Sequence, residues 1–397
     1  MLPYKWYSFF LHIFTWLGAT LMKYKKLLLS TVLVTLLAAC NNDTGNGGTE
    51  ETVPTTVIQN KEIYRIAEPV KVNIARGAIV NNVDNLVDIK ELEMGLMDLS
   101  TDQFPTDNYY LQEGQYLDSA TINSWIARKS DDKNGLNPSL TDTGDILKDE
   151  KKNPKVLSHV LEQDYVNSKG KIQGISLAVS LNKIYYIRAT DAAGLVYTDE
   201  IKVDQTENGK NEVEEQGKKI AETILKRIRA NSDIPDVPIF LTLYEETNKG
   251  NIVPGKFLAS SYIDKNDNTI AKWNDINRKY IAFPSSTFES LDRSLSNVLS
   301  TLEEDIQTQF KSLNIIMTGK LLYEEDELSN ITLDIEAPNI TSSETTAMIE
   351  YVGGKIESQI LPDYLPITVQ LSGTNEESKA IMIWDPSEKE IKTEIYE

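Results

Sequence analysis

Every acidic residue of this 397-residue chain follows Cys40. This uneven distribution separates an apolar N-terminal segment from the part of the chain that can form a water-exposed fold. The segment before Cys40 contains no Asp, Glu or Arg and only four of the 40 basic residues. The remainder therefore holds 36 basic and 60 acidic residues, a formal net charge of −24. An apolar environment suits the first segment, and only the part after it has the composition of a water-exposed fold.

The segment from Met22 to Cys40 has the successive parts of a bacterial export signal. Three lysines between residues 23 and 26 form a short positive region, and an apolar stretch at 27–37 follows. That stretch is shorter than the ~20 residues that a membrane-spanning helix needs. Small residues then lead to Cys40, which is typical of a signal peptide that is removed.

The end of this segment resembles a lipobox, the cleavage and lipidation motif of bacterial lipoproteins; it consists of Leu37, Ala38, Ala39 and Cys40. We expect a diacylglyceryl group on Cys40, whose two acyl chains hold a protein at a membrane better than one. This predicts a lipoprotein on the outer face of the cytoplasmic membrane of a Gram-positive bacterium, with lipoprotein-processing enzymes as partners. A membrane anchor helix followed by an unmodified cysteine is the alternative.

Composition divides the rest of the chain into regions. Residues 1–21 precede the complete signal and are interpreted as a mis-assigned upstream extension, or alternatively as part of a longer apolar anchor. Residues 22–39 form the signal peptide, and 40–60 form a polar, disordered tether that cannot bury a core. We expect a mixed N-terminal region at 61–170, a first repeat at 171–286, a linking helix at 287–311 and a second repeat at 312–397.

In the N-terminal region we expect a strand at 71–74 and helices at 88–100, 118–129 and 154–165. The third helix is predicted because Leu157, Val160, Leu161 and Tyr165 form an apolar stripe at helical spacing. Pro154 would occupy its first turn.

Two later stretches share one order of predicted elements: strands, a helix, a Pro-Asp turn and two further strands. In the first, the strands are at 174–181, 184–188 and 196–203, the helix is at 212–230, the turn is at 235–238, and the last strands are at 239–243 and 256–263. In the second, the corresponding positions are 313–322, 330–336, 342–360, 362–366, 367–371 and 379–384.

This order predicts an α+β fold with two tandem β-β-α-β-β-like repeats in the C-terminal two-thirds, preceded by a smaller mixed α/β region. An amphipathic helix at 287–310 links the repeats. Chance agreement of two common patterns is the alternative.

Composition excludes several kinds of site. The acidic excess argues against nucleic-acid binding, which needs a basic face. One cysteine allows no disulfide and no thiolate metal site. His159 is the only histidine after Cys40, and on the predicted helix it is interpreted as a surface residue rather than a catalytic base. We expect no metal, no cofactor and no catalytic residue.

Weaker candidates have simpler interpretations. Residues 264–268 resemble a calcium loop, but Thr269 replaces the required glycine, so a polar turn is predicted. The acidic run at 324–327 is interpreted as a hairpin tip. Trp125, Trp273 and Tyr364 could line a groove or pack in a core. Paired carboxylates could hydrolyse a glycosidic bond, but nothing selects two of the 60 acids.

Several longer segments carry a family resemblance, at 75–80 (ARGAIV), 112–117 (QEGQYL), 153–154 with 157–165 (LSHVLEQDY) and 174–176. They resemble the CamS family, the sex-pheromone-precursor lipoproteins of staphylococci, bacilli and their relatives. The resemblance extends from about residue 63 to residue 384.

The resemblance implies a second product, because pheromones of this type are apolar peptides cut from the end of a lipoprotein signal peptide. The matching residues here are Leu33, Val34, Thr35, Leu36, Leu37, Ala38 and Ala39. Signal peptidase and a further membrane protease would release the peptide, and a receptor in a recipient cell would bind it. An ordinary signal-peptide segment without this role is the alternative.

For the mature domain we expect a non-enzymatic binding or interaction module with an unknown ligand. The alternative is an extracytoplasmic hydrolase that uses acidic residues in a groove. A solute-binding lipoprotein with two hinged α/β lobes fits the strand-rich pattern poorly.

Overall fold

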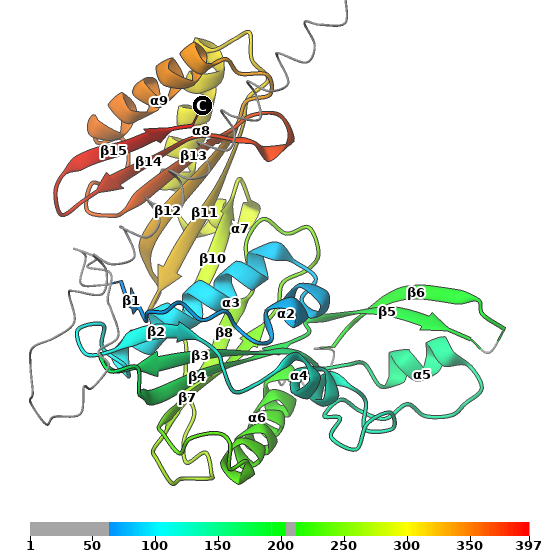
Figure 1. Ribbon diagram of the computed structural model, residues 1–397. Helices are drawn as coiled ribbons and strands as arrows, with labels where there is room; N and C mark the ends of the chain where they lie inside the picture. The colour runs from blue at the N-terminus through cyan, green and yellow to red at the C-terminus, as the bar shows by residue number, and fades with distance from the viewer. Residues whose placement is uncertain (1–62, 192, 204–211, 397) are drawn as a thin grey trace, which may run out of the picture. The chain divides into compact units, whose positions relative to one another are not determined.

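The computed structural model of this protein describes residues 63–191, 193–203 and 212–396. These residues form a seven-stranded sheet, a six-stranded sheet, a two-stranded sheet and eight α-helices (Figure 1). The predicted α+β class is confirmed.

The seven-stranded sheet has the strand order β1-β2-β3-β4-β7-β8-β9. Neighbouring strands are antiparallel, except that β1 is parallel to β2 and β4 is parallel to β7. The strands are β1 (Arg65–Ile66), β2 (Tyr110–Glu113), β3 (Leu157–Val166), β4 (Ile172–Leu181), β7 (Ile239–Glu245), β8 (Lys256–Ile263) and β9 (Asn274–Asp275).

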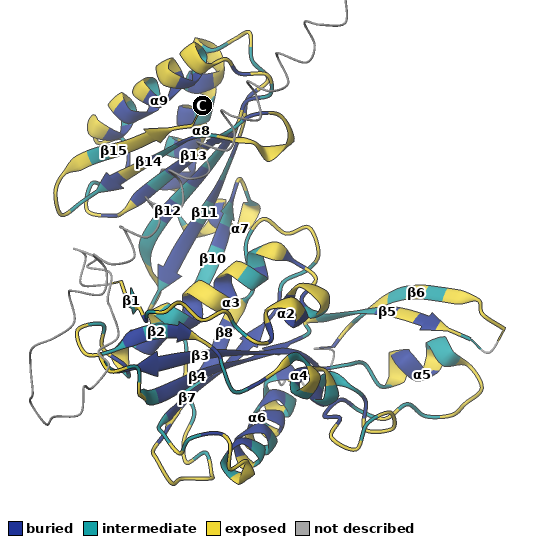
Figure 2. Cartoon of the chain, in the orientation of Figure 1, coloured by how far each residue is buried: buried dark blue, intermediate teal, exposed yellow. Residues whose placement is uncertain are grey.

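Helices cover both faces of this sheet, with α3 (Leu86–Leu99) on one face and α6 (Glu212–Ala230) on the other (Figure 1). Two shorter helices, α2 (Arg76–Asn82) and α4 (Ser119–Ile126), contact β3. Every residue of β3 and β7 is consequently buried, as the dark strands in Figure 2 show.

The helix predicted at 154–165 is wrong, because these residues form β3. Successive side chains of a strand point to opposite faces. Val160 therefore packs in the core beneath α6, whereas Leu161 packs in the core beneath α3. A strand that is apolar on both faces produces apolar residues at 3-and-4 spacing by coincidence, and periodicity alone cannot distinguish it from a helix.

The strand predicted at 71–74 is also wrong. These residues form no ladder, and the chain turns at Ile74 into α2. The Asn73 N–H donates to the Glu113 carboxylate at 2.5 Å, and the Asn73 side chain accepts from Ala75 N–H at 2.6 Å. Side-chain acceptors therefore hold this segment instead of a neighbouring strand.

The six-stranded sheet has the order β10-β11-β12-β13-β14-β15, in which only β12 and β13 are parallel. Burial alternates along β13 and β14, and the buried residues join one core with three helices. The elements are β10 (Arg278–Phe283), α7 (Ser286–Leu291), α8 (Arg293–Gln309), β11 (Ile316–Glu324), β12 (Glu327–Glu336), α9 (Ser342–Glu357), β13 (Ile367–Ser372), β14 (Ser378–Asp385) and β15 (Glu390–Ile395).

The helix expected at 287–310 is present as two helices that meet at Asp292. The Asp292 side chain accepts from Leu295 N–H at 2.9 Å, so it caps α8 while α7 ends. The apolar period continues across this break, and an N-terminal cap inside an amphipathic stretch is the signal that separates the two helices.

A separate hairpin of β5 (Ile184–Thr190) and β6 (Val196–Lys202) is held by α5 (Ile146–Lys152). Arg128 is 2% exposed, forms an ion pair with Glu150 of α5, and donates to the carbonyl oxygens of Pro138 at 2.9 Å and Asn153 at 2.7 Å. The Tyr185 hydroxyl of β5 donates to Glu150 at 2.9 Å. One buried cation thus joins the loop after α4, helix α5 and the hairpin.

We expect Arg128→Met to lower the free energy of unfolding by about 3 to 5 kcal/mol, because Glu150 would stay buried without its partner. Chemical unfolding measures this change. Lys151→Met is the matched control. It removes the exposed ion pair between Lys151 of α5 and Asp199 of β6, and the expected loss of unfolding free energy is below ~1 kcal/mol. Equal effects of the two substitutions would show that Arg128 is not the anchor.

Candidate functional site

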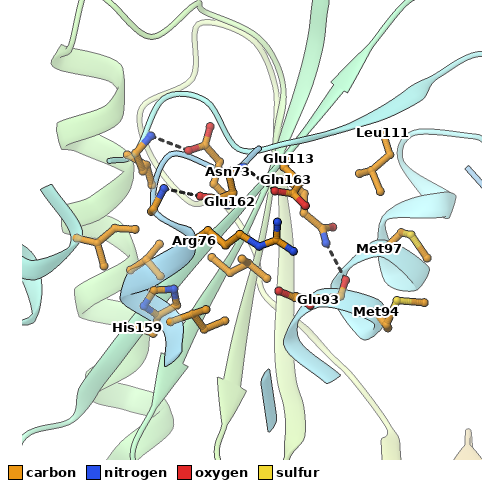
Figure 3. Close-up of a pocket in the computed structure, with 16 residues that line it drawn as sticks. Asn73, Arg76, Glu93, Met94, Met97, Leu111, Glu113, His159, Glu162 and Gln163 are labelled. Atoms are coloured by element: carbon orange, nitrogen blue, oxygen red, sulfur yellow. Dashed lines mark hydrogen bonds between the residues drawn. The ribbon is translucent and has the colours of Figure 1, made fainter. Parts of the chain in front are cut away.

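The residues predicted for cleavage, lipidation and the released peptide (Leu33 to Cys40) lie outside the described residues. The candidate site in the folded part was not predicted. It is a cavity of about 150 Å³ beside β3, enclosed by α2, α3, α4 and the end of β2 (Figure 3).

His159 lines this cavity and is not the surface residue that was predicted. It lies on β3 rather than on a helix, and only 1% of it is exposed. Its Nδ1 has no hydrogen-bond partner among the described residues. Burial lowers the pKa of His159 to about 4, so the imidazole is neutral at pH 7.

A β-bulge accounts for the position of His159. The register of β3 with β4 shifts between Leu157 and His159, which leaves Ser158 as the extra residue. Bulges change the direction of side chains and are frequent beside functional sites. Ser158 and His159 are both buried at this bulge.

The walls of the cavity are mainly apolar, and three carboxylates and one guanidinium group complete it. The apolar residues come from both faces of β3 and from the helices around it: Ala75, Ile79, Met94, Met97, Leu111, Leu117, Ile122, Val160 and Leu161. The charged residues are Arg76, Glu93, Glu113 and Glu162.

Glu162 is bound by the backbone. Its carboxylate accepts hydrogen bonds from the N–H groups of Gln115, Tyr116 and Leu117, the last at 2.6 Å. These donors stabilise the charged form. Burial nevertheless raises the pKa of Glu162, and burial together with the Glu162 charge raises the pKa of Asp164 well above its ordinary value.

Arg76, Glu93 and Glu113 form the charged mouth of the cavity (Figure 3). Burial and the charge of Glu113 raise the pKa of Glu93, and the charge of Arg76 opposes this shift. No ion pair joins Arg76 to either acid in the part of the chain that the structure describes. The mouth therefore carries one net negative charge that no cation neutralises.

A second buried polar group lies beside the start of β3, next to Ser158. Glu246 accepts hydrogen bonds from the hydroxyls of Ser158 and Ser180, the latter at 2.6 Å. Burial raises the pKa of Glu246 to about 8, so the carboxyl is mostly protonated at pH 7. We assign this group a structural role, because it lines no part of the cavity.

The other candidates from the sequence are ordinary structural features. Residues 265–266 form a turn after β8, and the acidic run is the tip of the β11–β12 hairpin. Trp125 is buried in the core, Trp273 packs against that core, and Tyr364 is exposed. The described ranges contain no cluster of three acidic, histidine or cysteine residues that could hold a metal ion.

Known proteins place this architecture in a family. The protein-family model described as "CamS sex pheromone cAM373 precursor" matches residues 71–390 of this chain. The chain belongs to the CamS family. The predicted resemblance is confirmed, and all sixteen residues that line the cavity lie within the matched CamS region.

Solved structures of CamS relatives share the fold. The crystal structure of a sex pheromone precursor from Lactobacillus salivarius is 26% identical, with a TM-score of 0.74, and covers 87% of this chain and 99% of its own. The C-terminal domain of the sex pheromone staph-cAM373 precursor from Staphylococcus aureus is 27% identical, with a TM-score of 0.66, and covers 80% and 98%. No curated protein matches the chain.

The segments that carry the CamS resemblance meet at the cavity. Residues 75–80, 112–117 and 157–165 supply ten of its sixteen lining residues. Their separation along the chain hides this proximity, which only the sheet creates. The family segments were therefore the one signal in the sequence that could have located the site.

We expect His159→Phe to make the fold less sensitive to acid. The folded pKa of about 4 lies below the ordinary 6.5, so the stability that neutral His159 contributes is present above pH 6.5 and is lost as the pH falls toward 4. Between pH 7 and 5 the parent chain should lose about 2 kcal/mol more than the variant. Urea unfolding at both pH values measures this, and parallel losses would contradict it.

We expect Glu246→Gln to have the opposite effect. The folded pKa of about 8 lies above the ordinary 4.5, so the contribution of protonated Glu246 is complete below pH 4.5 and is lost as the pH rises through 8. The variant should match the parent at pH 4.5 and exceed it at pH 9 by up to about 5 kcal/mol. Thermal unfolding across this range measures the difference, and a variant that is less stable at pH 9 would refute the assignment.

Proposed function

We propose that this CamS protein is a lipid-anchored surface protein and the precursor of a short apolar peptide. The observation that carries this proposal is the order of a lysine-rich segment, an apolar segment and Leu37-Ala38-Ala39-Cys40 at the start of a chain of this family. Cleavage before Cys40 would separate two products with different destinations.

The first product is the mature protein, held at the outer face of the cytoplasmic membrane by a diacylglyceryl group on Cys40. Two acyl chains support stable anchoring, since each buried methylene contributes about 0.8 kcal/mol. Residues 41–60 would act as the tether. The described residues contain no helix that is long and apolar enough to cross a membrane.

The second product is the peptide of residues 33–39. The names of the two solved relatives describe them as sex pheromone precursors, which supports the same role here. The peptide has no charged side chain. Its partners would be the lipoprotein-processing enzymes, a second membrane protease and a receptor in a recipient cell.

We propose a binding role without catalysis for the folded domain. Glycoside hydrolysis by two carboxylates needs one acid to donate a proton and another to act on the substrate. Three backbone N–H groups engage Glu162, and Asn73 N–H engages Glu113. These features favour the binding module over the hydrolase.

We also propose that the two larger sheets are tandem β-β-α-β-β units. The order β3-β4-α6-β7-β8 and the order β11-β12-α9-β13-β14 have the same strand directions. Ile175 N–H donates to the carbonyl oxygen of Pro238 at 3.1 Å, and Ile331 N–H donates to that of Pro366 at 3.2 Å. Pro238 and Pro366 occupy matching positions at the ends of the two Pro-Asp turns. The first unit would then begin at Leu157 rather than at residue 171, with β5 and β6 as an insertion.

Mass spectrometry of spent medium and of the membrane fraction tests the two products. We expect the peptide of residues 33–39 in the medium and a membrane protein that begins at acylated Cys40. Cys40→Ser should abolish both, because the hydroxyl cannot take the place of the alkylated thiol. Thr44→Ala in the tether is the control and should leave both unchanged.

The two parts of the proposal can fail separately. Acylated Cys40 without the peptide in the medium would retain the anchor and refute the precursor role. A membrane protein that keeps its residues before Cys40 would refute both.

A further inference from the structure

The cavity beside β3 contains a polar group that the protein itself does not satisfy. His159 is almost completely buried and lines the cavity, and its Nδ1 has no hydrogen-bond partner among the described residues. A neutral imidazole has one donor and one acceptor nitrogen. Burying such a group without a partner costs free energy, so a ligand that hydrogen-bonds to His159 would recover that cost.

The acidic residues at the mouth of the cavity favour a ligand with a positive charge. Glu93 and Glu113 lie close enough for the charge of one to raise the pKa of the other. Glu113 uses one carboxylate oxygen for Asn73 N–H, which leaves its second oxygen available. Arg76, from α2, points toward Glu93 (Figure 3) but compensates only one of the two acids. A ligand ammonium group would balance the mouth and would form charge-assisted hydrogen bonds.

The apolar part of the cavity fits a small apolar group. A cavity of 150 Å³ lined by aliphatic side chains holds about six carbon atoms, as in benzene. A leucine side chain has four. Met94 and Met97 line the same wall, and methionine adapts its shape to different apolar partners.

Exposed apolar residues adjoin the lining residues along the chain. Val72 and Ile74 flank the lining residue Asn73, and Val80 follows the lining residue Ile79. They are 55%, 45% and 64% exposed, and Met94 at the mouth is 51% exposed.

We propose that this cavity, between the buried imidazole of His159 and the Glu93–Glu113 carboxylates, binds an apolar residue that carries a free α-ammonium group. The ammonium group lies at the two carboxylates, the side chain fills the apolar walls, and the adjoining carbonyl oxygen accepts a hydrogen bond from His159. This chemistry occurs in a free apolar amino acid and at the amino terminus of an apolar peptide.

Arg76 distinguishes these two sources. A free amino acid has a second carboxylate oxygen, which Arg76 would bind, whereas a peptide has an amide at that position. The peptide of residues 33–39 begins with Leu33 and is apolar throughout. That peptide as a ligand rests on the proposed function, but the affinity of the cavity for an ammonium-bearing apolar residue does not.

Isothermal titration calorimetry of the full chain in lipid nanodiscs tests the inference, with three probes. They are L-leucine, the synthetic heptapeptide of residues 33–39 and the same heptapeptide with an acetylated amino terminus. We expect binding of leucine, the free heptapeptide or both. Acetylation removes the charge and should weaken peptide binding by about tenfold or more.

Matched variants locate the site. Glu93→Gln combined with Glu113→Gln should weaken binding of the preferred probe by about tenfold, and Ala75→Leu should abolish it by filling the cavity. Glu222→Gln removes one charge from the exposed face of α6 and should bind as the parent does. Arg76→Gln should lower the affinity for leucine relative to the affinity for the heptapeptide, because only leucine has a carboxylate for Arg76 to bind. Circular dichroism of each variant confirms that it is folded.

Binding of none of the probes would overturn the inference, as would equal affinity for the acetylated and free heptapeptides. Unchanged affinity in a folded Ala75→Leu variant would show that the ligand binds outside this cavity, which would also overturn the inference. These outcomes are separate from the release of the peptide into the medium. A released peptide that the protein does not bind would refute this inference alone, and bound leucine without a released peptide would refute only the precursor role.

Discussion

Burial of β3 on both faces is the constraint on which the rest of this fold depends. The strand lies inside the seven-stranded sheet, with α3 over one face and α6 over the other, so every residue of β3 is buried. Its sequence nevertheless contains Ser158, His159, Glu162 and Asp164. Each of these polar groups must find a partner within the protein or cost free energy.

The fold satisfies these groups to different degrees, and the differences separate structural residues from candidate functional ones. The Glu162 carboxylate accepts hydrogen bonds from three backbone N–H groups, and the Ser158 hydroxyl donates a hydrogen bond to Glu246. His159 remains without a partner at the wall of a cavity. The pKa of the buried His159 is lowered and the pKa of the buried Glu246 is raised from their ordinary values. Acid therefore destabilises this sheet through His159, and alkali destabilises it through Glu246.

Amphipathic helices and one-faced strands were predictable because their apolar periods are unambiguous. The expected helix at 212–230 coincides with α6, and the strand expected at 367–371 coincides with β13 apart from its last residue. The prediction failed at β3, where apolar residues directed to two different cores imitate a helical stripe. It also omitted β15, whose polar, mostly exposed side chains carry no apolar alternation.

The sequence by itself predicts the export and lipidation signal at Leu37 to Cys40, because processing enzymes recognise such linear motifs before folding. It also indicated the α+β class and the CamS family. Only the tertiary structure decided where His159, Glu93 and Glu113 meet. They belong to a buried strand, a covering helix and a short neighbouring strand, and long-range strand pairing rather than local spacing brings them to one cavity.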